Sequence, residues 1–162
     1  MRTIKFKGKC ISSKYEDKIA CGSLLSFPNG EVRIFEHDHD KLFNYYSVDP
    51  DTVCQFTGFL DKNGKEIYEG DVLRSDTYPF SCIEDNAYDN YYGVIGWSDE
   101  EALFYMVGAK NPKSSVRGIS DGISDTISQK MMQDFEVIGN VHDEEWKQYR
   151  AYIQDEDEEQ HQ

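Results

Sequence analysis

The sequence lacks the cysteine spacing and the apolar runs that mark several large classes of protein. Its four cysteines, Cys10, Cys21, Cys54 and Cys82, include no Cys-x-x-Cys pair of the kind that zinc and redox sites use. No stretch approaches the roughly 18 consecutive apolar residues of a membrane span, and the N-terminus has no apolar run of signal-peptide length. We therefore expect reduced, mostly buried thiols, no membrane partner and a cytoplasmic location.

Positive charge is also scarce, because 17 basic residues stand against 31 acidic ones and leave a net charge of -14. A chain this acidic is repelled by phosphate backbones, so general nucleic-acid binding is disfavoured. The charge is unevenly spread: residues 1–18 hold six basic and two acidic residues, and residues 143–162 hold two basic and eight acidic ones. Nucleic-acid binding therefore stays open as an alternative through a basic N-terminal strip, formed by Arg2, Lys5, Lys7, Lys9 and Lys14.

The common catalytic signatures are missing too. The chain has no nucleophile elbow, Walker loop, dinucleotide-binding fingerprint or His-Glu-x-x-His motif. Acid-base catalysis needs a carboxylate with a raised pKa in a cleft, whereas mere adjacency is expected by chance among 31 acidic residues. The carboxylates considered are Asp76, Glu84, Asp85, Asp89, Asp99 and Glu100. The sequence therefore assigns no catalytic residue and favours a protein that is not an enzyme.

One histidine-rich cluster, residues 36–40, keeps a second alternative open. On a strand, His37 and His39 would share a face, so both imidazoles could approach one zinc or other transition metal. Two ligands do not make a site, and nothing in the sequence places a third, such as His142, nearby. A metal-dependent hydrolase or nuclease is thus an alternative to an exposed polar edge or loop, and we assign no metal and no cofactor.

The N-terminal residues that are present favour strands. Residues 3–9 alternate in polarity, and residues 20–27 and 31–35 flank a Pro-Asn-Gly turn, a pattern typical of a hairpin. Residues 37–46 have no clean period, and a turn with Pro50 follows. We therefore predict an N-terminal β unit over residues 1–46.

Stronger strand signals follow from residue 52. A β-prone run, a turn at residues 61–64 and a second run at 66–73 predict another hairpin, and Gly70 inside the second run predicts a bulge or bend. Further strands are predicted at 92–98, 102–107 and 135–138, with long loops at 75–90 and 108–130.

The C-terminal residues predict a helix and then a tail. Residues 143–153 offer an N-cap acid and late basic residues, as the helix macrodipole favours. We therefore predict a mainly β protein with a small, strongly bent sheet or SH3-like barrel. The barrel and the C-terminal helix occupy residues 47–153, and an acidic disordered tail occupies residues 154–162.

Three ordered motif blocks resemble the YopX family of phage and prophage proteins. They are residues 52–73 (Thr-Val-Cys-Gln-Phe-Thr-Gly-Phe-Leu-Asp-Lys-Asn-Gly-Lys-Glu-Ile-Tyr-Glu-Gly-Asp-Val-Leu), residues 135–141 (Phe-Glu-Val-Ile-Gly-Asn-Val) and residues 1–7 (Met-Arg-Thr-Ile-Lys-Phe-Lys). The resemblance implies a β-rich fold in a bacterial host cell, and it brings no known catalytic set. The chain departs from the family pattern at Cys54 and Phe56, where Gly and Tyr are common, and in its long loops and acidic tail.

The signature residues suit a structural role. Gly58, Asn63-Gly64 and Gly70-Asp71 provide turns, and an Asp after Gly often bonds neighbouring backbone amides. The rest of the run provides packing residues. We therefore interpret Asp71 as part of the scaffold rather than as a catalytic group.

Aromatic residues make up 14% of the chain and include 11 tyrosines. Tyrosine suits protein interfaces, because its ring buries area at low entropic cost while its hydroxyl stays hydrogen-bonded. We therefore expect an uncharacterised phage or prophage accessory protein that acts as a non-enzymatic protein-binding or self-assembling module. Its expected partners are copies of itself or a host or phage protein, and its specific function is expected in the loops, the tail or an assembly surface.

Overall fold

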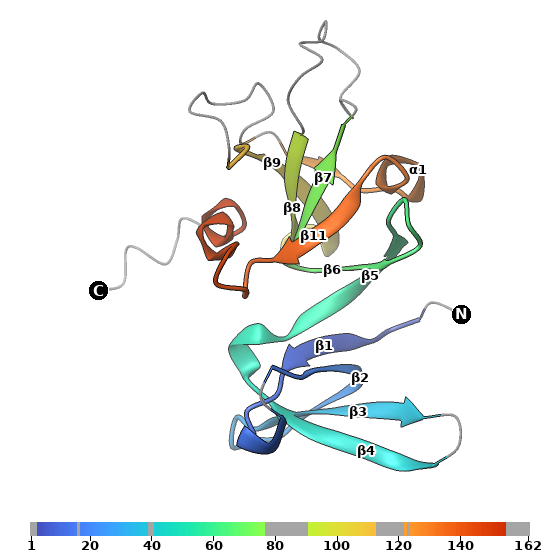
Figure 1. The fold of residues 1–162 in the computed structure, drawn as a ribbon, viewed down its shortest axis with the longest axis vertical. Helices are drawn as coiled ribbons and strands as arrows, with labels where there is room; N and C mark the ends of the chain where they lie inside the picture. The colour runs from blue at the N-terminus through green and yellow to red at the C-terminus, as the bar shows by residue number, and fades with distance from the viewer. Residues whose placement is uncertain are drawn as a thin grey trace, which may run out of the picture. The chain divides into compact units, whose positions relative to one another are not determined.

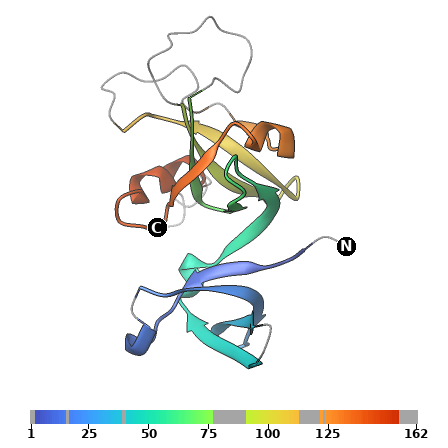
Figure 2. The same ribbon diagram turned by 45° about the vertical axis from the view of Figure 1, so that its right-hand side comes forward.

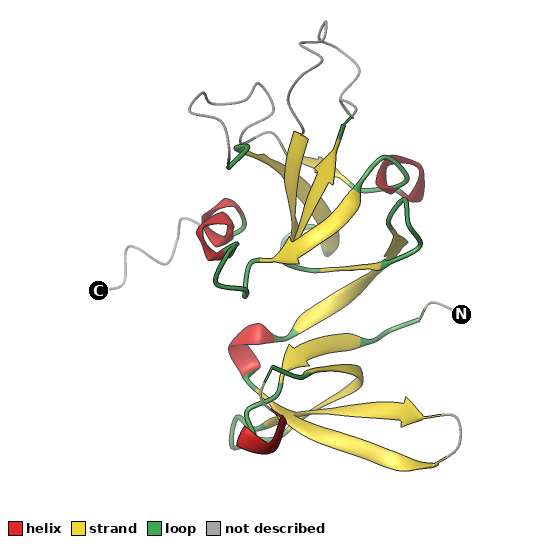
Figure 3. Ribbon diagram, viewed as in Figure 1, coloured by secondary structure: helices red, strands yellow, loops and turns green. Residues whose placement is uncertain are grey.

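The structure is a computed structural model that describes residues 3–15, 17–38, 41–76, 91–112, 122 and 124–154, without the side chains of residues 37, 38 and 41–43. Strands dominate and form two antiparallel sheets, as Figures 1 and 3 show. The predicted mainly β fold is therefore confirmed. The chain divides into two compact units, residues 1–58 and residues 59–162, which we call the first unit and the second unit. The boundary predicted near residue 47 lies inside a strand, and this division follows Gly58.

The first sheet has the strand order β4-β3-β2-β1-β5-β6. Its strands are β1 (Phe6–Lys9), β2 (Ile19–Ser26), β3 (Val32–Asp38), β4 (Lys41–Val48), β5 (Cys54–Leu60) and β6 (Glu66–Tyr68). Two 3-10 helices, η1 (Ser13–Tyr15) and η2 (Pro50–Thr52), lie between these strands in the chain. Strand β5 crosses the division: its first residues pair with β1, and its far end leads into β6 of the second unit.

The predicted N-terminal hairpin is confirmed as β2 and β3. Its turn is closed by the Phe27 amide, which donates to the Glu31 carbonyl over 2.8 Å. Strand β4 was not predicted, although it pairs with β3 in register, with Ile34 opposite Tyr46. Aromatic residues on both of its faces, such as the exposed Tyr45 beside the half-buried Tyr46, hide the two-residue period that normally reveals a strand.

The first unit has a small core around Ala20, Ile34 and Val48. The sheet bends around this core, because Cys10 at the end of β1 forms a bridge with Val48 although β2 and β3 separate the two strands in the sheet. The Asp49 amide completes the bend by donating to the Lys9 carbonyl over 2.9 Å.

The second sheet has the strand order β10-β9-β8-β7-β11 and lies within the second unit. Its strands are β7 (Asp71–Ser75), β8 (Tyr91–Ser98), β9 (Leu103–Ala109), β10 (Ser124–Thr126) and β11 (Glu136–Asn140). Across the described ranges no closed barrel forms, so the SH3-like barrel is not confirmed.

Both faces of this second sheet are buried. Leu73, Ile95 and Met106 pack on one face with residues around the short helix α1 (Gln129–Met132). Val72 and Val94 pack on the other face with Tyr149 of the 3-10 helix η3 (Lys147–Tyr152). Helices α1 and η3 lie on opposite sides of the sheet in both views (Figures 1 and 2). Burial on both faces explains why β8 and β9 read as continuous apolar runs instead of alternating ones.

The predicted C-terminal helix is present, but it is a 3-10 helix rather than an α-helix. Its turns follow an i to i+3 pattern, with Trp146 donating to Asp143 and Tyr149 donating to Trp146, each over 2.9 Å. Three residues per turn place Trp146, Tyr149 and Tyr152 on one side, and their neighbouring rings lie 5.5 and 5.9 Å apart. The 3-10 geometry therefore brings the three aromatic rings together, and the end charges used in the prediction do not distinguish a 3-10 helix from an α-helix.

The segment predicted as a loop at 108–130 ends in ordered structure. It contains strand β10 and the start of helix α1, whose N-cap Ser128 accepts the Met131 amide over 3.3 Å. Much of this loop, most of the loop at 75–90 and the tail from residue 155 lie outside the described residues. Within the described ranges, no helix is both long and apolar enough to cross a membrane.

Candidate functional site

Asp71 lies at a fully buried corner where two of the motif blocks meet. One carboxylate oxygen accepts the Tyr68 amide over 2.8 Å, and the other accepts the side-chain amide of Asn140 over 2.9 Å. The Asn140 amide also reaches the Glu69 carbonyl over 3.1 Å, and the Val141 amide donates to Gly70 over 2.9 Å. Asp71 therefore bonds a neighbouring backbone amide, as predicted, and joins the signature run to the closing motif.

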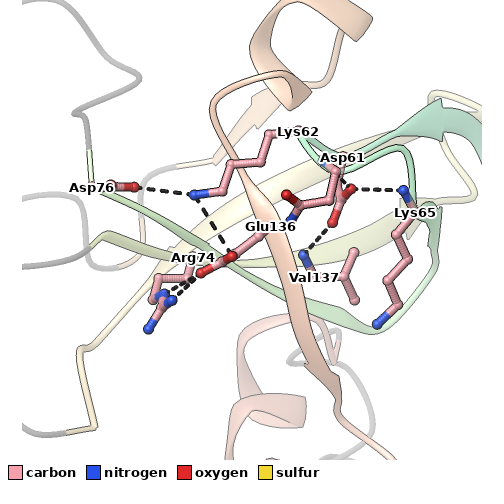
Figure 4. Close-up of polar contacts among 8 residues, drawn as sticks. Asp61, Lys62, Lys65, Arg74, Asp76, Glu136 and Val137 are labelled. Atoms are coloured by element: carbon pink, nitrogen blue, oxygen red, sulfur yellow. Dashed lines mark hydrogen bonds and ion pairs between the residues drawn. The ribbon is translucent and has the colours of Figure 1, made fainter.

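Asp61 makes a second junction of the same kind, drawn in Figure 4. One of its carboxylate oxygens accepts the amides of Asn63 and Lys65, each over 2.8 Å, and so fixes the predicted turn. The other oxygen accepts the Val137 amide of β11 over 3.0 Å. Asp61 is 2% exposed, so its carboxylate is buried, and it accepts hydrogen bonds from these three backbone amides. The two buried aspartates of the signature are thus parts of the scaffold.

A chain of charged side chains runs over the same region (Figure 4). Lys62 lies 3.4 Å from Asp76 and 3.8 Å from Glu136, and Arg74 donates from Nε to Glu136 over 2.7 Å and also bonds it through Nη2. The hydrogen bond that Arg74 donates to Glu136 raises the pKa of Arg74. A bond from its own backbone N–H, and then Lys62, lowers the pKa of Asp76. These pairs link β7, β11 and the β5–β6 turn at a surface where solvent screens them.

The histidines and cysteines are not gathered into a metal centre in the described part of the chain, where no group of three or more His, Cys, Asp or Glu side chains could hold an ion. His39 and the side chain of His37 lie outside that part, so their site stays a prediction. His142 is half-buried and its backbone amide donates to Asn140 over 3.0 Å. Of the thiols expected to be mostly buried, Cys54 is buried and Cys21 is exposed.

Two residues of the predicted basic strip, Lys5 and Lys14, lie over aromatic rings in the first unit. Lys5 lies 5.1 Å from the centre of the Phe56 ring, and Lys14 lies 5.3 Å from that of Tyr15. Arg33, outside the predicted strip, lies 4.9 Å from the Phe27 ring. Sequence reasoning missed these contacts, of which the contact between Lys5 and Phe56 joins residues distant in the chain.

A pocket of about 610 Å³ opens in the second unit at the end of β8 and β9. We call it the acidic pocket; its lining includes Asp99, Glu100, Glu101, Tyr105, Ser124 and Tyr152. The Trp97 indole N–H donates a hydrogen bond to the Asp99 carboxylate over 2.8 Å, and the Glu101 backbone amide donates to the Ser98 hydroxyl over 3.2 Å. These bonds order the turn that carries the three carboxylates. Asp99 and Glu100 were among the carboxylates considered from sequence, where nothing distinguished them from the others.

The aromatic walls of the acidic pocket are held in place by their neighbours. Gly96 lies opposite Tyr105 in the hairpin, and a Cβ at residue 96 would lie 2.4 Å from the tyrosine ring. The missing side chain therefore lets this ring lie directly against the sheet. Tyr152 stacks on Tyr149 and accepts the Lys110 amide over 3.0 Å. Rings beside carboxylates, with no basic residue among the lining residues that the structure describes, form a site suited to a cation.

These features define a two-unit, mainly β protein in which the most strongly patterned residues build the scaffold. The chain belongs to the YopX family, whose model, described as YopX protein, matches residues 11–145. The predicted resemblance is thereby confirmed. A similar solved structure is the crystal structure of protein EF1440 from Enterococcus faecalis, at 19% identity and a TM-score of 0.43, covering 88% of this chain and 95% of that chain. No curated protein matches the chain.

Proposed function

We propose that this protein is a non-enzymatic protein-binding module that holds a partner at the acidic pocket. The observation that supports this proposal is the ordered combination of carboxylates and tyrosine rings around one concave surface. Aromatic rings in a concave site supply binding area, and a few fixed polar groups supply orientation. The family resemblance and the absence of common catalytic motifs support a phage or prophage accessory role in the host cytoplasm.

The proposal is tested with a defined partner. Affinity capture from host cells, followed by mass spectrometry, supplies candidates that are then purified and titrated calorimetrically. Wild-type protein should bind the purified partner, and the variant Asp99→Asn, Glu100→Gln, Glu101→Gln should bind it at least about tenfold more weakly. A partner that binds the variant and wild type equally would place its binding surface elsewhere and contradict the proposal.

Nucleic-acid binding by the first unit is a second candidate, favoured by its cation and ring contacts. Arg33 lies 5.1 Å from the ring of Tyr45, which is 57% exposed, and an exposed ring beside a guanidinium can stack on a base. Fluorescence anisotropy with a single-stranded oligonucleotide at low salt should then show binding that Tyr45→Ala weakens. No binding at low salt would exclude this candidate.

Self-association is a third expectation, since the first unit exposes apolar side chains. Ile11 and Ile19 are 63% and 47% exposed, and Leu25 is 43% exposed. Light scattering over a range of concentrations should show a dimer or larger species, and a monomer at high concentration would contradict the expectation.

A further inference from the structure

We propose that the acidic pocket takes a lysine or arginine side chain from an exposed segment of the partner protein, an inference that rests on the proposed function. Three consecutive carboxylates, Asp99, Glu100 and Glu101, line one side of the pocket. A guanidinium or ammonium group there forms charge-assisted hydrogen bonds with these oxygens. The aliphatic stem of the same side chain packs on apolar surface such as Tyr105 and Val107.

The tyrosine rings strengthen the preference for a cation. The face of an aromatic ring is electrostatically negative, so a cation within about 6 Å of its centre is attracted to it. Because Gly96 leaves room for it, the Tyr105 ring lies on the sheet as part of the pocket surface. An anionic ligand would be repelled both by the negative ring faces and by the carboxylates. The pocket chemistry therefore selects charge of one sign.

The charge of the surrounding unit favours the same partner. Residues 59–162 hold 23 acidic and nine basic residues, so the second unit attracts basic segments over a distance. Diffuse attraction alone would not require the pocket. The distinguishing feature is that the Trp97 indole fixes Asp99 over 2.8 Å, so this carboxylate is already oriented before a ligand arrives.

Short labelled peptides test the ligand class directly. One carries two lysines between glycine and serine residues, a second carries two arginines, and a third carries two citrullines, which keep the shape of arginine without its charge. Anisotropy should show binding of at least one charged peptide, weakened by salt, and no binding of the citrulline peptide. Equal binding of the arginine and citrulline peptides would overturn the proposal.

Variants of the pocket separate a local site from diffuse charge. The triple variant Asp99→Asn, Glu100→Gln, Glu101→Gln should weaken charged-peptide binding by about tenfold or more. A matched triple variant neutralises exposed carboxylates outside the pocket lining, Asp134, Glu144 and Glu145, and should change binding by less than about twofold. Equal weakening by both triple variants would mean that net charge, not the pocket, attracts the peptide.

The aromatic contribution has its own pair of variants. Tyr105→Leu should weaken binding by about threefold, and Tyr105→Phe, which keeps the ring, should retain it. The chain also contains an internal reporter, because its two tryptophans are Trp97, which lines the pocket, and Trp146, the N-cap residue of η3. On peptide addition, the Trp97 indole N–H resonance should shift while that of Trp146 stays in place. A shift of Trp146 alone would overturn the assignment.

The failure of this inference can be distinguished from the failure of the proposed function. If the purified partner loses binding to the pocket triple variant while no charged peptide binds wild type, the cation inference fails and protein binding at the pocket stands. If the partner binds the triple variant unchanged, the proposed function fails at this site. Thermal melts of each variant, compared with wild type, show that the loss reflects binding rather than unfolding.

Discussion

The two units of the protein carry similar numbers of basic residues but very different numbers of acidic ones. The first unit holds eight basic and eight acidic residues, whereas the second unit holds nine basic and 23 acidic residues. The whole net charge of -14 therefore belongs to the second unit. Repulsion of a phosphate backbone by net negative charge is therefore expected of the second unit and not of the first.

The units also differ in how their polar groups are used. In the first unit, cations lie over aromatic rings and the described polar contacts are mostly at least partly exposed, as with Arg33 over Phe27. In the second unit, Asp61 and Asp71 are buried and join segments far apart in the chain, such as Asp71 and Asn140. The comparison indicates that the buried aspartates of the signature motif stabilise the second unit, and that the surfaces proposed for binding differ in chemistry between the two units.

The largest expected effect is from Asp71→Ala, which tests whether buried bonds hold the second unit together. The change removes the Asp71 oxygen that accepts the buried Tyr68 amide and one of the acceptors of the Asn140 side-chain amide, and such losses cost about 3 kcal/mol in total. Urea unfolding followed by tryptophan fluorescence measures it, because both tryptophans lie in the second unit. The matched variant in the first unit is Asp49→Ala, which removes an exposed bond to the Asp51 amide and should cost about 1 kcal/mol or less. Equal losses of unfolding free energy in Asp71→Ala and Asp49→Ala would contradict the expected difference between the two units.

The next largest effect is expected from Gly22→Ala, which tests the close contact between β2 and β3 in the first unit. A Cβ at residue 22 would lie 1.9 Å from the backbone oxygen of Phe35, and backbone cannot move aside as a flexible side chain can. Overpacking of this kind costs about 2 kcal/mol, and far-UV circular dichroism during urea unfolding measures the loss. Ser26→Ala, on the same strand and exposed, should stay within about 0.5 kcal/mol of wild type. If Gly22→Ala were equally harmless, the tight strand contact would not be required.

Local chemistry explains which parts of the fold could be predicted from sequence. The turn at Asp61 and Asn63-Gly64 and the role of Asp71 depend on residues a few positions apart, so the pattern contains the needed information. Strand β4 was missed because aromatic residues occupy both of its faces. The C-terminal helix predicted at residues 143–153 is present at Lys147–Tyr152, and its 3-10 hydrogen bonds could not be predicted from capping residues and end charges.

The acidic pocket could not be predicted for a different reason. Asp99 and Glu100 come from one turn, but Tyr152 comes from a helix far along the chain, and only folding brings them together. One part of the signal was available: in a hairpin with its turn at residues 99–102, Gly96 lies opposite Tyr105. A glycine opposite a tyrosine indicates a ring lying against the sheet. It does not indicate which carboxylates lie beside that ring.

A smaller effect is expected from Glu136→Gln, which sharpens the contrast between long-range and local ion pairs. Glu136 bonds Arg74, 62 residues away in the sequence, whereas Glu31 bonds Arg33, two residues away. Glu136→Gln should therefore cost about 1 kcal/mol or less after solvent screening, and Glu31→Gln should cost less than that. Urea unfolding of both variants at low and high salt measures the difference. High salt should reduce both effects, and a larger loss from Glu31→Gln would reverse the expected order.

The smallest effect concerns acid stability, to which both units contribute. The hydrogen bond from Arg33 lowers the pKa of Glu31 below its ordinary value of 4.5, and the pKa of Asp76 is lowered below 3.8. Because the unfolded chain takes up these protons first, each carboxylate stabilises the fold fully above its ordinary pKa and loses this contribution as pH falls through the lowered value. Melting temperatures measured from about pH 6 to about pH 2 should fall less steeply for Glu31→Gln and for Asp76→Asn than for wild type.

Salt and a second variant decide whether that acid dependence belongs to these pairs. Asp76 is exposed and Glu31 is half-buried, so solvent ions reach both carboxylates and about 1 M salt should reduce the difference between each variant and wild type. Glu144→Gln, which removes a highly exposed i,i+3 pair with Lys147, should leave the slope unchanged. A low-salt slope of melting temperature against pH that coincides for Glu31→Gln and wild type but differs for Asp76→Asn would place the acid sensitivity in the second unit alone. The contrast between the two units would then extend from their net charge to their titration.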